Sequence, residues 1–155
     1  SVLQRRPERT RQRKPTSANP NDHPAIHPNY LATTTDQETI VKGIQIARKI
    51  STYDPLKAHI TEEYAPGREI AMDDEAGTLE WARNTAVTIY HPTGTCKMGP
   101  DKMSVVDERL RVHGVKGLRV ADASIMPTIT SGNTNAPSIM IGEKASDMIL
   151  EDSRQ

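Results

Sequence analysis

Residues 90–98 read Tyr-His-Pro-Thr-Gly-Thr-Cys-Lys-Met, and the rest of the sequence is interpreted around them. It follows the β-prone run 87–90 and then turns at Pro92 and Gly94, which respectively restrict and free the backbone. The pattern predicts a strand that ends at His91 and presents its imidazole at a sheet edge, where functional sites are often built. Because an imidazole ordinarily exchanges protons near neutral pH, His91 is a candidate acid–base residue.

Composition limits the possible classes of protein. The chain has 155 residues with 20 basic and 20 acidic side chains, so no net charge steers it towards nucleic acid or an acidic membrane. Aromatic residues make up only 3% of the chain and phenylalanine is absent, so few large side chains are available to form an independent core. The first residue is not methionine. We therefore expect a piece of a longer protein. The basic run 5–14 lacks interleaved aromatics and is interpreted as a solvated or partner-covered segment, not a nucleic-acid arm.

Three helices are predicted in the first half of the chain. The first spans about 36–50, where Thr35 and Glu38 form a capping-box pattern. Its apolar face would consist of Ile40, Ile44 and Ala47. A short helix is expected at about 56–64. A third is expected at about 74–84, with the core candidates Leu79 and Trp81.

The second half predicts two short strands and a long helix. Residues 105–125 alternate β-prone runs with glycine turns and would deliver Asp122 at a strand end. The helix spans about 136–152, with Asn135 as N-cap and Pro137 tolerated in the first turn. Its apolar stripe comprises Ile141, Ala145 and Met148.

Three features combine into a candidate site: His91, the pair Asp122-Ala123, and the polar turn 131–135 that reads Ser-Gly-Asn-Thr-Asn. The turn feeds a helix N-terminus, whose free amides favour an anion or developing negative charge. Each feature also has a structural interpretation, namely a turn histidine, a strand-end aspartate and a helix cap.

Five segments carry a resemblance to a known family. Residues 91–99 read His-Pro-Thr-Gly-Thr-Cys-Lys-Met-Gly, 118–127 read Leu-Arg-Val-Ala-Asp-Ala-Ser-Ile-Met-Pro, and 132–144 read Gly-Asn-Thr-Asn-Ala-Pro-Ser-Ile-Met-Ile-Gly-Glu-Lys. With 24–31 and 69–81 in the same order, the chain resembles the C-terminal part of the glucose–methanol–choline (GMC) oxidoreductases, nearest the choline dehydrogenase and alcohol dehydrogenase branch.

The resemblance implies a mixed fold, α+β or α/β. Residues 1–90 would form part of the substrate-binding domain, with its antiparallel sheet and helices. Residues 91–155 would form the catalytic segment and close the FAD-binding domain with its last strand and C-terminal helix. The family's Gly-x-Gly-x-x-Gly turn is absent from this sequence. The basic run 9–15 replaces an alternating strand, so we expect residues 1–20 to be poorly ordered.

The resemblance also implies an activity. These enzymes use FAD to oxidise an alcohol, such as choline or another primary alcohol, to an aldehyde. His91 matches the general base that takes the hydroxyl proton. Asn133 matches the second catalytic position, where an amide can hydrogen-bond the substrate oxygen but cannot act as a base. The positions that match flavin-contacting segments are Asp122, Ala123, Thr134 and Asn135.

Further expectations concern partners. The electron acceptor would be oxygen or a quinone-type carrier, and the missing FAD-binding portion would lie on the same or another chain.

No metal is expected, because His91 and Cys96 lack a second ligand pair, and no third group orients a Cys96 nucleophile. We expect the protein to lie in the cytoplasm or on the cytoplasmic side of a membrane, and not to be secreted. The alternative is an inactive remnant or partner-binding fragment that needs another chain for FAD.

Overall fold

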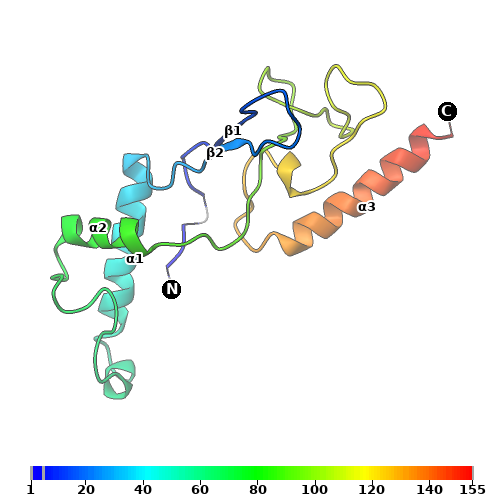
Figure 1. Cartoon of the computed structure of the whole chain (residues 1–155). Helices are drawn as coiled ribbons and strands as arrows, with labels where there is room; N and C mark the ends of the chain where they lie inside the picture. Colours follow the sequence, from blue (N-terminus) through cyan, green and yellow to red (C-terminus); the bar gives the residue numbers. More distant parts are fainter. Residues whose placement is uncertain (1, 5, 155) are drawn as a thin grey trace. The chain divides into compact units, whose positions relative to one another are not determined.

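The structure is a computed structural model that describes residues 2–4 and 6–154. It divides into two compact units, one extending to Ile89 and one beginning at Tyr90. Helices together with a small antiparallel sheet confirm the mixed class (Figure 1). The elements in chain order are β1 (Gln12–Lys14), β2 (Ala25–His27), α1 (Thr34–Ile50), the 3-10 helix η1 (Leu56–His59), α2 (Glu75–Thr85), the 3-10 helix η2 (Ala123–Ile125) and α3 (Asn135–Asp152).

The sheet of the first unit is a two-stranded antiparallel ladder. β1 pairs with β2 in a register that places Arg13 opposite Ile26. Residues 12–14 of the basic run therefore form a strand although their side chains are exposed, because ladder hydrogen bonds come from the backbone. The expected poor order of residues 1–20 falls partly on positions 1 and 5, which lie outside the described residues.

The start of α1 is set by a buried carboxylate. Asp36 is fully buried and accepts hydrogen bonds from Gln4 Nε2 at 2.6 Å and from the Glu8 backbone N–H at 2.9 Å. The N-cap is Thr33, whose Oγ1 accepts from the Asp36 backbone N–H at 3.2 Å. The predicted cap at Thr35 is wrong, because the helix begins earlier, where Asp36 can reach the N-terminal segment.

The buried face of α1 differs from the predicted one. Val41, Ile44 and Arg48 are buried, whereas Ile40 is half-buried and Ala47 is exposed. The buried polar side chains near the two ends of α1 fix its rotation. Because this rotation follows from tertiary hydrogen bonds, apolar periodicity alone could not predict it.

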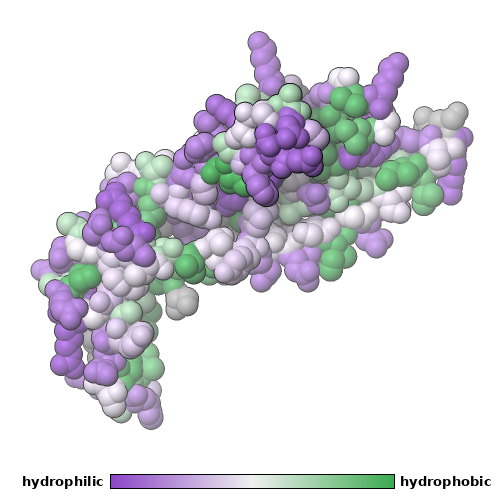
Figure 2. All heavy atoms as spheres, viewed as in Figure 1, coloured by the Kyte–Doolittle hydropathy of each residue, from purple (hydrophilic) through white to green (hydrophobic). Residues whose placement is uncertain are grey.

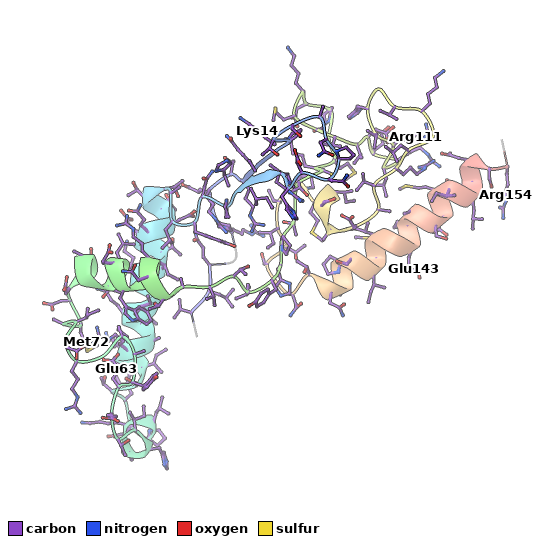
Figure 3. All side chains as sticks on the ribbon, in the orientation of Figure 1. Lys14, Glu63, Met72, Arg111, Glu143 and Arg154 are labelled. Atoms are coloured by element: carbon purple, nitrogen blue, oxygen red, sulfur yellow. The ribbon has the colours of Figure 1, made fainter. Side chains whose placement is uncertain are left out.

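Arg48 ties the following loop to α1. It is 8% exposed, its Nε lies 2.8 Å from Glu63 Oε1, and its NH2 group donates to the Ile70 carbonyl at 2.8 Å. Figure 3 labels Glu63 in this loop. The predicted helix at 56–64 is wrong beyond residue 59, since the chain becomes extended at Ile60.

α2 confirms the predicted third helix. Asp74 caps it by accepting from the Gly77 backbone N–H at 2.9 Å, and the helix packs against α1 (Figure 1). The core candidates Leu79 and Trp81 are only half-buried. Thr78 and Ala82 are the buried residues, because small side chains allow the two helices to approach closely.

The second unit has its own core beneath α3. Residues 105–125 form no extended strands, so the two predicted strands are wrong. Isolated bridges join Val106 to Val112 and Arg111 to Arg119, because turns at Gly114 and Gly117 interrupt any longer pairing. The buried cluster comprises Val106, Leu110, Ile125, Met126, Ile141 and Ala145.

α3 presents two different faces. Ile141 and Ala145 are buried and Met148 packs against them, which confirms the predicted stripe. Other apolar side chains on this helix are exposed, and Figure 2 shows hydrophobic groups at the surface over α3. These exposed residues are Ile139, Met140, Ile149 and Leu150. Among the described helices, none is long and apolar enough to cross a membrane.

Candidate active site

The segment before His91 is irregular, so the predicted strand at 87–90 is wrong. The described sheet consists of β1 and β2, and residues 87–90 are not part of it. Tyr90 instead adopts the left-handed conformation, with φ 63, and its side chain is 79% exposed. Such a backbone costs a non-glycine residue about 1–2 kcal/mol, and residues of this kind cluster at functional sites. This left-handed residue begins the second unit and immediately precedes His91.

The turn after His91 is held against η2. Gly94 has φ +81, and a Cβ there would lie 3.2 Å from the Met126 carbonyl oxygen. The Cys96 backbone N–H then donates to the Ser124 carbonyl at 3.0 Å. Only glycine adopts this positive φ without strain. The close approach of the two segments also favours a residue that has no Cβ.

Asp122 is the N-cap of η2 and does not end a strand as predicted. Its Oδ1 accepts from the Ser124 backbone N–H at 2.7 Å, and its side chain is exposed. Ala123 is half-buried against the core. The hydrogen bond between Cys96 and Ser124 connects this 3-10 turn to the segment that carries His91.

His91 and Thr134 form the central contact of the site. His91 is half-buried, and its Nδ1 lies 2.8 Å from Oγ1 of Thr134, which is 8% exposed. Two side chains 43 positions apart in the sequence are thus brought within hydrogen-bonding distance. The hydroxyl of Thr134 contacts the candidate base, and the expected position of Thr134 near the flavin stays a prediction.

The N-terminus of α3 lacks a side-chain cap. Thr134, not the predicted Asn135, is the N-cap, and Asn135 is the first helical residue. Thr134 has φ −84 and ψ 0, whereas a capping threonine usually has an extended backbone, and its side chain bonds no helix amide. An N-cap hydroxyl is ordinarily worth about 1 kcal/mol, so this stabilisation is forgone where the hydroxyl faces His91.

The first turn of α3 suits an electron-rich ligand. It holds no acidic residue, and the side chains of Asn133 and Asn135 are exposed on either side of Thr134. Amide side chains and uncapped backbone N–H groups at a positive helix end are donors for negative charge. Among the described residues, no group of three or more His, Cys, Asp and Glu side chains could hold a metal ion.

The matched family decides the class of protein. A family model described as GMC oxidoreductase matches residues 14–142, which is most of the chain. The chain belongs to the GMC oxidoreductase family. It is 48% identical over 134 residues to alcohol dehydrogenase [acceptor] of Pseudomonas putida, and 50% identical over 133 residues to oxygen-dependent choline dehydrogenase of Escherichia coli. Each match covers 86% of this chain and 24% of the relative, so this GMC chain spans about a quarter of their length.

Solved structures of GMC oxidoreductases have the same fold over this region. Pyridoxine 4-oxidase from Mesorbium loti superposes with a TM-score of 0.83 at 31% identity, covering 92% of this chain and 28% of that one. A fungal aryl-alcohol oxidase superposes with a TM-score of 0.86 at 26% identity, and the match covers 97% of this chain and 25% of that one. Formate oxidase of Aspergillus oryzae, studied for its FAD modification, gives 0.80 at 30% identity, covering 93% and 25%. The mixed helix-and-sheet arrangement is therefore that of a segment of these oxidoreductases.

Sequence reasoning missed an arginine cluster on Asp152 at the far end of α3. Arg109 NH2 lies 2.8 Å from Asp152 Oδ1 and Arg111 NH2 lies 2.7 Å from Oδ2, and Arg119 also contacts Oδ2. Figure 3 labels Arg111. Hydrogen bonds from Arg111, then Arg119 and Arg109, lower the pKa of Asp152 from 3.8 to about 2 against the opposing effect of burial. Arginines flanking the buried Leu110 were the available sequence signal.

Proposed function

We propose that this chain supplies the proton-transfer residues of an FAD-dependent GMC enzyme that oxidises a primary alcohol, choline or another, to its aldehyde. Its relatives include an alcohol dehydrogenase and a choline dehydrogenase, and it spans about a quarter of their length. The remaining FAD-binding portion is provided by the same polypeptide or by another chain. The observation that carries the proposal is the engaged Nδ1 of His91 beside an uncapped helix N-terminus.

The residues fit part of the cofactor. Exposed Asn133 and Asn135, with the open amides of α3, are suitable donors to the electron-rich edge of a flavin. Asp122 and Ala123 are assigned to the ribityl and phosphate region. When bound, FAD would supply the acceptor for the hydride that leaves the carbinol carbon. The nine glycines form no Gly-x-Gly-x-x-Gly cluster, so the ADP half of the cofactor is assigned to the other portion.

His91 acts as the general base. With Nδ1 engaged by Thr134, Nε2 is the ring nitrogen left to take the hydroxyl proton. The Asn133 amide donates to the substrate oxygen and stabilises the charge that develops as the proton leaves. Losing one such hydrogen bond costs roughly 1.5–3 kcal/mol, so Asn133→Ala should slow flavin reduction accordingly.

The test is anaerobic stopped-flow reduction of the flavin by an alcohol, in the complete enzyme that contains this chain. His91→Ala should lower the limiting rate about 10²–10⁴-fold. His91→Gln keeps a hydrogen bond but accepts no proton, so it should restore substrate binding more than rate. A His91→Ala rate within a few-fold of wild type at every pH contradicts the proposal.

The second candidate is an inactive or partner-binding fragment. The exposed apolar side chains of the described residues favour a covering partner in either case. The two candidates differ in one result, because only an active enzyme reduces its flavin with an alcohol. Reoxidation with oxygen or a quinone then identifies the acceptor. We place the enzyme in the cytoplasm or on the cytoplasmic side of a membrane, which cell fractionation would test.

A further inference from the structure

The hydroxyl of Thr134 is withdrawn from its ordinary local role. Thr134 is the N-cap of α3, yet its side chain bonds no backbone N–H of the first turn. Its Oγ1 is instead 2.8 Å from His91 Nδ1. Thr134 as a residue is 8% exposed, so little water reaches this contact to compete for the histidine nitrogen.

The backbone at Thr134 is held firmly enough to aim this hydroxyl. Its carbonyl oxygen accepts the Ser138 backbone N–H at 3.0 Å and the Ser138 hydroxyl at 2.7 Å. Threonine is β-branched, so few side-chain rotamers compete. A fixed backbone and a stiff side chain together give the imidazole a defined partner.

We propose that Thr134 is a positioning residue that accepts a hydrogen bond from Nδ1–H of His91 and keeps the lone pair on Nε2. This inference rests on the proposed function of His91 as the base. A neutral imidazole carries one proton, and the partner of one nitrogen decides which nitrogen bears it. If the threonine hydroxyl donated to Nδ1, the proton would sit on Nε2, and that nitrogen could not take one from the alcohol. The productive arrangement therefore requires Thr134 as acceptor.

The experiment compares Thr134→Val with Thr134→Ser in the complete FAD-loaded enzyme. Valine keeps the shape and removes the acceptor, so the limiting rate of flavin reduction should fall about 10- to 100-fold, with KM for the alcohol changing less than kcat. Serine keeps the acceptor and should stay within about three-fold of wild type. The matched control is Ser153→Ala, which removes a hydroxyl at the opposite end of α3, bonded to the Leu150 carbonyl, and leaves Thr134 and its contacts in place; it should also stay within about three-fold.

A spectroscopic measurement separates positioning from simple destabilisation. Nitrogen-15 shifts of labelled His91 should show the proton on Nδ1 in wild type and Thr134→Ser, and a mixture of tautomers in Thr134→Val. The inference is overturned if Thr134→Val matches wild type, if serine fails to rescue it, or if wild-type His91 carries its proton on Nε2.

The His91→Ala variant separates a failure of the inference about Thr134 from a failure of the proposed function. If His91→Ala is inactive while Thr134→Val is unimpaired, the inference fails and the proposed function stands. If His91→Ala remains active, the proposed function itself fails. Because Thr134 would act through His91, the double variant should be no slower than His91→Ala.

Discussion

Individual residues near His91 have conformations that local stability alone does not favour. Tyr90 has a left-handed backbone, and Thr134 gives up the capping bond that a threonine at a helix start ordinarily makes. Both residues lie next to or against His91. We infer that the packing of the second unit compensates for these local costs, since strained residues persist only where their surroundings hold them.

Gly94 offers a test of how tightly the turn after His91 must be built. Both Gly94 and Gly114 have a positive φ, which strains an alanine. The Cβ of Gly94→Ala would also lie 3.2 Å from the Met126 carbonyl oxygen, whereas the Cβ of Gly114→Ala would have no atom within 4 Å. Both should lower the free energy of unfolding by about 1–2 kcal/mol, and Gly94→Ala by more. Urea unfolding of the two variants gives the comparison. Equal losses would show that the close contact relaxes without cost.

At the scale of elements, α3 is fixed at three places along its length. Thr134 contacts His91 at its start, Ile141 and Ala145 enter the core, and Asp152 receives three arginines at its end. The arginine cluster also places positive charge at the helix C-terminus, where it is favourable. A helix held in this way gives the His91 contact a rigid support.

The arginine cluster makes a pH-dependent contribution to stability. The pKa of Asp152 is lowered from 3.8 to about 2, chiefly by Arg111, so its contribution is present above about pH 4 and is lost as pH falls through 2. Wild type should therefore be more stable than Asp152→Asn at pH 5, and the gap should close between about pH 4 and pH 2. Denaturant melts at these pH values measure it.

A carboxylate on the same helix provides the control for this pH dependence. Oδ2 of Asp147 lies 3.8 Å from Nζ of Lys144, and the two side chains are 64% and 61% exposed, respectively. Such a pair contributes little, so Asp147→Asn should leave the unfolding free energy nearly unchanged across the same range. A gap for Asp152→Asn that stays constant with pH would mean that the cluster acts by packing and not by charge.

At the scale of the whole molecule, the described residues expose much apolar surface. Tyr64 is 97% exposed and Val87 is 82% exposed, and the larger apolar side chains left open outnumber those buried. Soluble proteins rarely leave extensive apolar surface uncovered. This exposed surface agrees with the proposal that the chain works together with a further FAD-binding portion.

The 155-residue chain on its own should therefore not bind FAD. After addition of FAD and gel filtration, we expect no flavin absorbance to co-elute with the protein, because the Gly-rich pyrophosphate turn is absent from this sequence. The complete enzyme is the positive control under the same conditions. A stoichiometric yellow complex formed by the isolated chain would contradict the prediction.

The family, the helices with clear local signals and the candidate site residues were all predictable from the sequence. α2 has an aspartate cap and α3 has an apolar stripe, and both were predictable because capping and periodicity are local properties. The long motifs around His91 and Asn133 identified the family, which the match over residues 14–142 then showed. The roles of the site residues remain predictions.

Only the tertiary structure decided which faces are buried and which side chains meet. The rotation of α1 follows from Asp36 and Arg48, whose partners are remote in sequence. The strands predicted at 87–90 and 105–125 did not form, since β-propensity gives a strand only where a neighbouring segment completes the ladder. The bond between His91 and Thr134 joins positions 43 apart, and no local pattern specifies a contact made by the folding of an entire unit.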